Sequence, residues 1–180
     1  MIINIEQIYN YAAQFRKAID EAKLNEKSLS RDIAFRSFPW GCCGATCYLL
    51  AEYLRMSGIE TVYVGGEEGD QTHAWLVVKD DRILQPTMYV TELPEDIIGV
   101  WSCYSGKQCE STIINDNYTE KDIEEGLIID ITADQFGQSP DHVGYLKDFH
   151  ERFEFVQAHD CDILYSYRLR ELFQTIMKYI

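Results

Sequence analysis

The feature that most constrains the fold of this chain is the order in which helical and extended hydrophobic patterns follow one another. Apolar residues recur at steps of three and four over about residues 4–24, from Cys43 to Gly58, and again over residues 162–180, which predicts three helices. Between the last two lie segments rich in β-branched and aromatic residues, which predict strands at residues 59–65, 73–78, 82–84 and 127–131. Consecutive strands without intervening helices favour an antiparallel sheet, so we expect an α+β fold.

The length and the remaining segments predict one domain with an irregular middle. At 180 residues the chain can bury a single core, and we expect one domain over residues 1–180. Lys23 to Ser30 is polar and predicts a connection, and Glu67 to Asp70 predicts an acidic loop. Residues 88–126 contain scattered Pro, Gly and Asn with no sustained period, and we interpret them as an irregular insertion.

The charge balance excludes one class of partner. The chain has 16 Lys and Arg against 30 Asp and Glu, and this net charge of −14 would repel a nucleic-acid backbone. No apolar run approaches the roughly 20 residues that a membrane-spanning helix needs, and the first residues lack the basic and apolar regions of a signal peptide. We therefore expect a cytoplasmic protein without a membrane partner, whose six cysteines are reduced thiols.

One of these thiols lies where the second helix is predicted to begin, within Gly41-Cys42-Cys43-Gly44. The thiolate is the nucleophilic form of cysteine, and the unpaired N–H groups at a helix N-terminus favour negative charge there. The backbone N–H groups around Cys42 and Gly44, and the indole N–H of Trp40, are candidate donors to an oxyanion. This position predicts Cys43 as a candidate nucleophile.

The alternative interpretation is that these cysteines are small buried hydrophobic residues, as most cysteines are. That interpretation is favoured for Cys47, which lies one turn inside the apolar stripe of the predicted helix, and also for Cys42. For Cys43 the two interpretations stay open on the position alone, so a second feature is needed to decide between them.

A histidine and a carboxylate supply that feature. His73 stands in the strand Thr72-His73-Ala74-Trp75-Leu76, just after a polar loop, where a base could face a cleft. Asp130 interrupts the apolar strand Leu127 to Ile131, and a buried carboxylate without a partner is very costly. A histidine N–H would satisfy it and fix the imidazole tautomer. Taken alone, His73 could equally be a core histidine, and Asp130 could accept backbone N–H groups at a turn.

Together these motifs resemble the transglutaminase-like branch of the papain-like cysteine protease superfamily. The segment that begins at Cys43 is similar to its nucleophile helix, and Arg55 stands 12 residues after Cys43, in the register usual for that family. His73-Ala74-Trp75 resembles its histidine strand, and Asp130-Ile131-Thr132 its Asp-x-Thr strand. A bacterial or phage-borne branch and the lasso-peptide leader peptidases carry similar motifs. The resemblance covers under a third of the chain, at residues 38–78 and 127–136.

The resemblance implies a papain-like fold, in which the nucleophile helix packs on an antiparallel sheet that carries the histidine and the acid, with helices flanking at both ends. It implies a Cys43 nucleophile, a His73 base and an Asp130 that orients the imidazole. The thiolate would attack an amide of a peptide or protein, and water or an amine would resolve the thioester. No cofactor is implied, and the oligomeric state stays open.

The chain departs from the pattern of that family in two ways. Papain-like peptidases carry an oxyanion glutamine shortly before the nucleophile, whereas the nearest upstream glutamine here is the remote Gln14. The acid also lies far from the histidine, and Gln85, within Leu84-Gln85-Pro86-Thr87, is a rival for the third position of the triad and a candidate substrate contact. We favour Asp130, which makes residues 80–126 an insertion that could serve as a lid or specificity element.

Two other classes of function remain open. A zinc site could use Cys43, Cys47, Cys103 and Cys109, although the tight Cys pairs of structural zinc sites are missing. The chain could also be a catalytically inactive, acidic binding module of the same fold, because function belongs to sites and not to folds. Asp134 could cap a turn after the Asp130 strand or bind substrate, and we favour the cap. The remaining histidines are interpreted as surface or packing residues: His142, His150 and His159.

Overall fold

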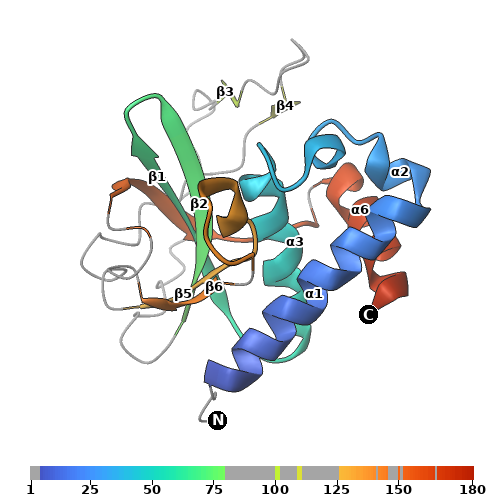
Figure 1. The fold of residues 1–180 in the computed structure, drawn as a ribbon, viewed down its shortest axis with the longest axis horizontal. Coiled ribbons are helices and arrows are strands. Elements are labelled where there is room, and N and C mark those ends of the chain that lie inside the picture. Colours follow the sequence, from blue (N-terminus) through green and yellow to red (C-terminus); the bar gives the residue numbers. More distant parts are fainter. Residues whose placement is uncertain are drawn as a thin grey trace, which may run out of the picture.

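A five-stranded antiparallel sheet lies against a group of helices in the computed structural model of this protein, which confirms the predicted α+β class (Figure 1). The strand order is β6-β5-β2-β1-β7, and neighbouring strands pair antiparallel throughout. The structure describes residues 5–79, 100–101, 109–110, 126–140, 142–145, 150, 152–164 and 166–180.

The helices begin and end close to where the sequence predicts. They are α1 (Ile5–Asn25), α2 (Lys27–Ser30), α3 (Cys43–Met56) and α6 (Tyr167–Ile176), with 3-10 turns at η1 (Phe35–Ser37), η2 (Ala133–Phe136) and η3 (Met177–Tyr179). The predicted polar connection over residues 23–30 is wrong in detail, because α1 continues to Asn25 and α2 buries Leu29. None of the described helices is both long and apolar enough to cross a membrane.

The sheet contains two strands that the sequence analysis missed. The predicted strands are present as β1 (Thr61–Glu68), β2 (Gln71–Val78) and β5 (Leu127–Asp130), and the additional ones are β6 (His142–Tyr145) and β7 (Glu154–Asp160). Both missed strands lie at the edges of the sheet, and most of their residues are exposed or half-buried, so their sequences lack a continuous apolar signal.

Most of the predicted insertion over residues 80–126, and the predicted strand at 82–84, lie outside the described residues. Within the insertion the structure gives a two-stranded ribbon of β3 (Val100–Trp101) and β4 (Cys109–Glu110). The role of this segment as a lid, and the extent of the domain, stay predictions.

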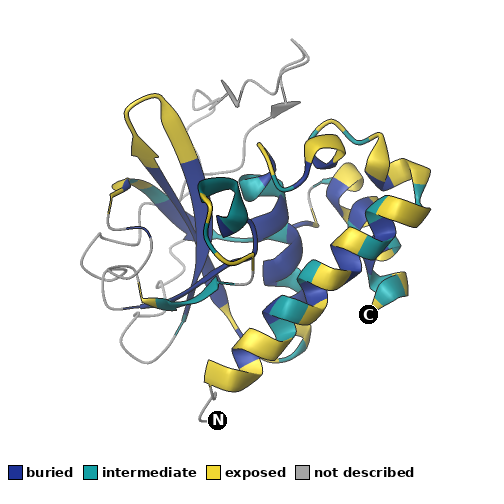
Figure 2. Cartoon of the chain, viewed as in Figure 1, coloured by how far each residue is buried: buried dark blue, intermediate teal, exposed yellow. Residues whose placement is uncertain are grey.

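Both faces of the sheet are buried (Figure 2). One face carries Ala74, Leu76 and Ile129, which join the core that α1, α3 and α6 build. The other face carries Trp75 and Ile128, which form a second cluster that also includes Val62, Val64, Val77, Phe153 and Ala158. Side chains alternate between the faces of a strand, so His73 lies on the face of Trp75.

The hairpin between β1 and β2 sets the register of His73. The predicted acidic loop over residues 67–70 is shorter in the structure, because Glu67 and Glu68 belong to β1 and the turn is made by Gly69 and Asp70. Gly69 has a φ of 58°, which glycine adopts at little cost in tight hairpin turns. The resulting register places Gly66 opposite His73.

Gly66 is predicted to be a position where even one methyl group destabilises the fold. A Cβ there would lie 2.8 Å from the Trp75 ring, 2.9 Å from the Phe153 Cβ and 3.1 Å from the Glu154 carbonyl oxygen. Overpacking of this kind costs about 1–3 kcal/mol, so Gly66→Ala should lower the free energy of unfolding by that amount in urea denaturation.

Gly65 provides a matched control for this measurement. A Cβ at Gly65 would come closest to the side chain of Gln157, at 3.1 Å, and that flexible side chain can move aside. Gly65→Ala should therefore cost clearly less than Gly66→Ala. Equal losses in the two variants would contradict the packing argument.

Candidate active site

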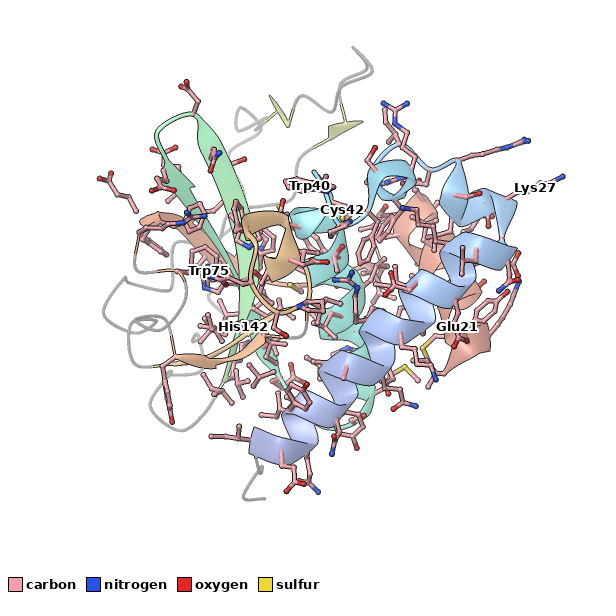
Figure 3. All side chains as sticks on the ribbon, in the orientation of Figure 1. Glu21, Lys27, Trp40, Cys42, Trp75 and His142 are labelled. Carbon is pink, nitrogen blue, oxygen red and sulfur yellow. The ribbon has the colours of Figure 1, made fainter. Side chains whose placement is uncertain are left out.

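Cys43 is the first residue of α3, as the sequence predicts. Its N-cap, Cys42, makes no side-chain cap hydrogen bond, so no side chain occupies the first N–H groups of the helix from that position. Gly41 turns the chain into the helix with a φ of 68°. The Cys43 side chain is half-buried, and Trp40 lies beside Cys42 at the same helix end with 61% of its surface exposed (Figure 3).

The other described thiols are poor nucleophiles. Cys42 is buried and donates its S–H to the Pro39 carbonyl oxygen at 3.0 Å, and burial raises the pKa of this thiol to about 12. Burial, followed by the nearby Asp130 carboxylate, raises the pKa of Cys47. Burial and the charge of Asp160 raise the pKa of Cys161. These thiols stay protonated at neutral pH.

His73 is held by Asp130 in the interior of the protein. The His73 Nε2 atom lies 2.6 Å from Asp130 Oδ2, and both side chains are almost fully buried. Because an ionised carboxylate only accepts hydrogen bonds, Nε2 carries the proton and donates it, and Nδ1 is the second site for a proton. The predicted contact between His73 and Asp130 is therefore present.

Asp130 is saturated with hydrogen-bond donors. Its Oδ1 atom accepts from the Thr132 backbone N–H at 2.8 Å and from the Thr132 hydroxyl at 2.9 Å. Its Oδ2 atom contacts a second imidazole besides His73, that of His150, at 2.9 Å. The sequence analysis interpreted His150 as a surface or packing residue, and its contact with Asp130 was not foreseen.

The charges in this cluster shift the pKa values of its members in opposite directions. Burial alone would lower the pKa of His73, but the hydrogen bond to Asp130 and the interaction with the Cys43 side chain raise it to about 9. Burial would raise the pKa of Asp130, but the two imidazoles hold it well below its usual range. The cluster therefore keeps Asp130 ionised, and the side chain of Cys43 lies within interaction range of His73.

Gln135 is a polar neighbour of His73 that the sequence analysis did not single out. Its amide nitrogen lies 3.3 Å from His73 Nδ1 and donates to the Thr132 carbonyl oxygen at 3.0 Å. The signal that could have found it is its position in the turn directly after Asp130. The predicted candidate Gln85 lies outside the described residues. Gly44 follows Cys43 in the first turn of α3.

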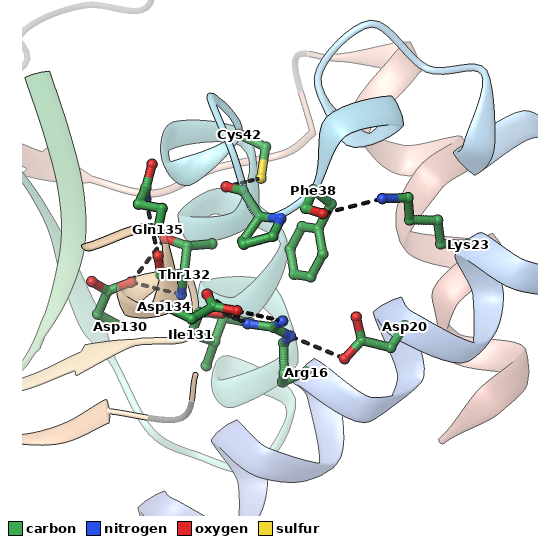
Figure 4. A network of polar contacts seen from close by, with 11 residues as sticks. Arg16, Asp20, Lys23, Phe38, Cys42, Asp130, Ile131, Thr132, Asp134 and Gln135 are labelled. Atoms are coloured by element: carbon green, nitrogen blue, oxygen red, sulfur yellow. Dashed lines mark hydrogen bonds and ion pairs between the residues drawn. The ribbon is translucent and has the colours of Figure 1, made fainter. Parts of the chain in front are cut away.

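Arg16 ties the turn after Asp130 to helix α1 (Figure 4). Its guanidinium donates to the Ile131 carbonyl oxygen at 2.7 Å and to both carboxylate oxygens of Asp134 at 3.0 and 2.9 Å. It also lies 4.5 Å from the centre of the Phe38 ring, in the segment that leads to Cys43. Asp134 was expected to cap a turn with its side chain, whereas that side chain pairs with Arg16.

Arg55, which sets the register of the resemblance, lies away from this cluster. Its guanidinium pairs with Glu52 one turn earlier on α3, at 2.7 Å, and its side chain is half exposed. The pairing of Arg55 is local to the helix surface, where such ion pairs contribute little stability.

A metal ion is the alternative ligand for this cluster. His73, Asp130 and His150 offer three ligand atoms within 4.8 Å of one another. The Nε2 atoms of His73 and His150 lie 2.6 and 2.9 Å from Asp130 Oδ2, which are the distances of hydrogen bonds. Ligands on a tetrahedral zinc ion, with bonds of about 2.0–2.1 Å, lie roughly 3.3 Å apart. The geometry therefore favours hydrogen bonds.

The predicted four-sulfur zinc alternative cannot be placed, because the side chains of Cys103 and Cys109 lie outside the described residues. Within the part of the chain that is described, Cys43 and Cys47 are free thiols. Comparison with protein-family models, with curated proteins and with solved structures found no match to this chain.

The titration of His73 is predicted to make the protein less stable at alkaline pH. A pKa raised from 6.5 to about 9 contributes stability that is fully present below pH 6.5 and is lost as the pH rises through 9. His73→Gln removes the titrating group, so the fall in the free energy of unfolding between these pH values should become shallower. Urea denaturation at a series of pH values measures this.

His159→Gln is the control for the pH series. Burial lowers the pKa of His159, so this residue loses stability only as the pH falls through the unfolded value of 6.5. Its substitution should leave the alkaline slope unchanged. An alkaline slope in His73→Gln as steep as in the wild type would refute the assignment.

Arg16 is predicted to matter for stability far more than its neighbour Lys17. Arg16→Met should lower the free energy of unfolding by about 2 kcal/mol, because charge-assisted hydrogen bonds to Ile131 and Asp134 are lost. The exposed Lys17, whose amine lies 3.7 Å from Glu21, makes a weak surface pair. Lys17→Met should change the stability by less than about 0.5 kcal/mol, and similar losses in both variants would contradict the role of Arg16.

Proposed function

We propose that this chain is a cysteine-dependent hydrolase or acyltransferase of papain-like, transglutaminase-like fold, which acts on an amide bond of a peptide or protein. The observation that carries the proposal is the position of His73, which donates to Asp130 through Nε2 and interacts with the Cys43 side chain. In this proposal Cys43 of α3 is the nucleophile, His73 of β2 the base and Asp130 of β5 the group that orients the base.

The chemistry follows from the two ring nitrogens of His73. Its Nδ1 atom accepts the proton of the Cys43 thiol, and the thiolate attacks the carbonyl carbon of the amide, so that a C–S bond forms. The C–N bond then breaks, and the amine leaves with the proton that His73 returns. Water, deprotonated by the same nitrogen, attacks the thioester and releases the carboxylic acid and the thiol. Asp130 keeps the second proton of the ring on Nε2 throughout.

Two groups of donors are available for the oxyanion that forms during this attack. The backbone N–H groups in the first turn of α3, at Cys43 and Gly44, have no intrahelical acceptors. The amide of Gln135 lies on the Nδ1 side of His73, which is the side that receives the thiol proton. In this proposal Gln135 takes the place of the glutamine that papain-like peptidases carry before the nucleophile.

The acidic hairpin supports a cationic segment in the substrate. Glu67, Glu68 and Asp70 are exposed, and Glu67 directly follows Gly66, the residue opposite His73. This charge would attract a basic peptide segment, or a lysine amine that competes with water for the thioester. Hydrolysis, deamidation and amine transfer are therefore separate outcomes of the test below.

The proposal predicts that Cys43 is the reactive thiol. Iodoacetamide near neutral pH, followed by peptide mapping, should modify Cys43 at least about tenfold faster than Cys42, because a thiol held protonated reacts slowly. Incubation with glutamine-containing peptides, with and without a primary amine, then identifies the reaction by mass. A gain of about one dalton means deamidation, cleavage products mean a peptidase, and an amine adduct means a transferase.

Cys42→Ala is the matched control for Cys43→Ala. The two residues are adjacent, yet only the Cys43 variant should lose activity, since the Cys42 thiol is engaged with Pro39. Loss of activity in the Cys42 variant alone would reverse the assignment. An unreactive Cys43 together with an unchanged peptide panel would favour the inactive binding module.

A further inference from the structure

His150 is a buried polar residue that the proposed reaction does not use. Only 1% of its surface is exposed, and its Nε2 atom lies 2.9 Å from Asp130 Oδ2, the same oxygen that His73 contacts. The ring is fixed by aromatic neighbours, with ring centres 4.8 Å from Trp75 and 5.6 Å from Phe153. The imidazole of His150 is thus packed among aromatic rings with its Nε2 atom facing the carboxylate of Asp130.

The ionised Asp130 decides which ring nitrogen of His150 acts as the donor. Since the carboxylate is ionised, the Nε2 atom of His150 must carry a proton and donate it. Its Nδ1 atom is buried and has no hydrogen-bond partner within the described part of the chain. His150 thus donates one hydrogen bond, from Nε2 to Asp130 Oδ2.

Two imidazoles therefore compete for one carboxylate oxygen. A hydrogen bond from His150 stabilises the negative charge on Asp130 and draws electron density from Oδ2. Asp130 therefore attracts a protonated His73 less strongly than it would without the hydrogen bond from His150.

We propose that His150 is a positioning residue of the candidate active site. It fixes Asp130 and limits how strongly this carboxylate stabilises the doubly protonated form of His73. A base that keeps its proton too firmly cannot return it to a leaving amine, so the limit matters for the second half of the proposed reaction. The inference rests on the proposed function for this consequence, whereas the shared oxygen itself is a property of the fold.

Other titratable groups also face this cluster and must stay unchanged in the test. Helix α3 contributes Cys43 and Cys47, and strand β2 contributes His73. His142 of β6 pairs with Asp130 in the sheet register, and the guanidinium of Arg152 lies over the Phe153 ring. The variants below substitute none of these residues.

The experiment is an NMR titration of the His73 imidazole in full-length protein. His150→Phe keeps a ring of similar size in the aromatic pocket but removes the donor, so the pKa of His73 should rise by about one pH unit. His150→Gln keeps an N–H donor and should stay near the wild type. His159→Phe removes another buried histidine, one that stacks on Tyr63 and does not contact Asp130, and should leave His73 unchanged.

An unchanged or lowered pKa of His73 in a folded His150→Phe variant would overturn the inference, and so would equal shifts in the Phe and Gln variants. Alkylation of Cys43 in the wild type separates this result from the proposed function. If Cys43 is reactive but the pKa of His73 does not change, only the proposed role of His150 is contradicted. If the pKa of His73 changes but Cys43 is unreactive, the shared carboxylate is supported and the proposed reaction is contradicted.

Discussion

The structure depends above all on the need to satisfy one buried negative charge. A carboxylate in an apolar strand is tolerated only when donors surround it, and Asp130 has four hydrogen bonds, two from Thr132, one from His73 and one from His150. These donors come from strand β2, from the turn after β5 and from the segment before β7. The hydrogen bonds to this one carboxylate therefore fix three parts of the chain relative to one another.

A second set of charges joins that arrangement to the helices. Arg16 belongs to α1 and touches none of the proposed catalytic groups, but it binds the turn that follows Asp130 and lies against Phe38. The turn and the segment that leads to Cys43 are thereby held by the same guanidinium. A helix without a single proposed catalytic residue thus contributes to the relative position of the acid and the nucleophile.

The parts of the fold that the sequence predicted are those with strong local signals. Periodicity predicts the apolar face of α1 and the start of α3 at Cys43. The apolar run around Asp130 predicts β5, and the cost of burying a charge there predicts a partner for the carboxylate. The strand β7 begins with Glu154 and ends with His159 and Asp160, and its apolar residues neither alternate nor form a continuous run, so its sequence carries no strand signal. The contact between His150 and Asp130 could not be predicted, because it arises only from tertiary packing across 20 residues of chain.

The distance along the chain between His73 and Asp130, 57 residues, has a consequence for the synthesis of the protein. A nascent chain that has exposed only α3 and the first hairpin contains Cys43 and the proposed base His73, but not yet Asp130, which contacts His73 in the folded protein. A slip of one residue between β2 and β5 would likewise turn His73 to the opposite face. Under the proposed function, Cys43 therefore has no oriented base until the sheet has closed in its correct register, so an immature chain would not carry out the proposed reaction.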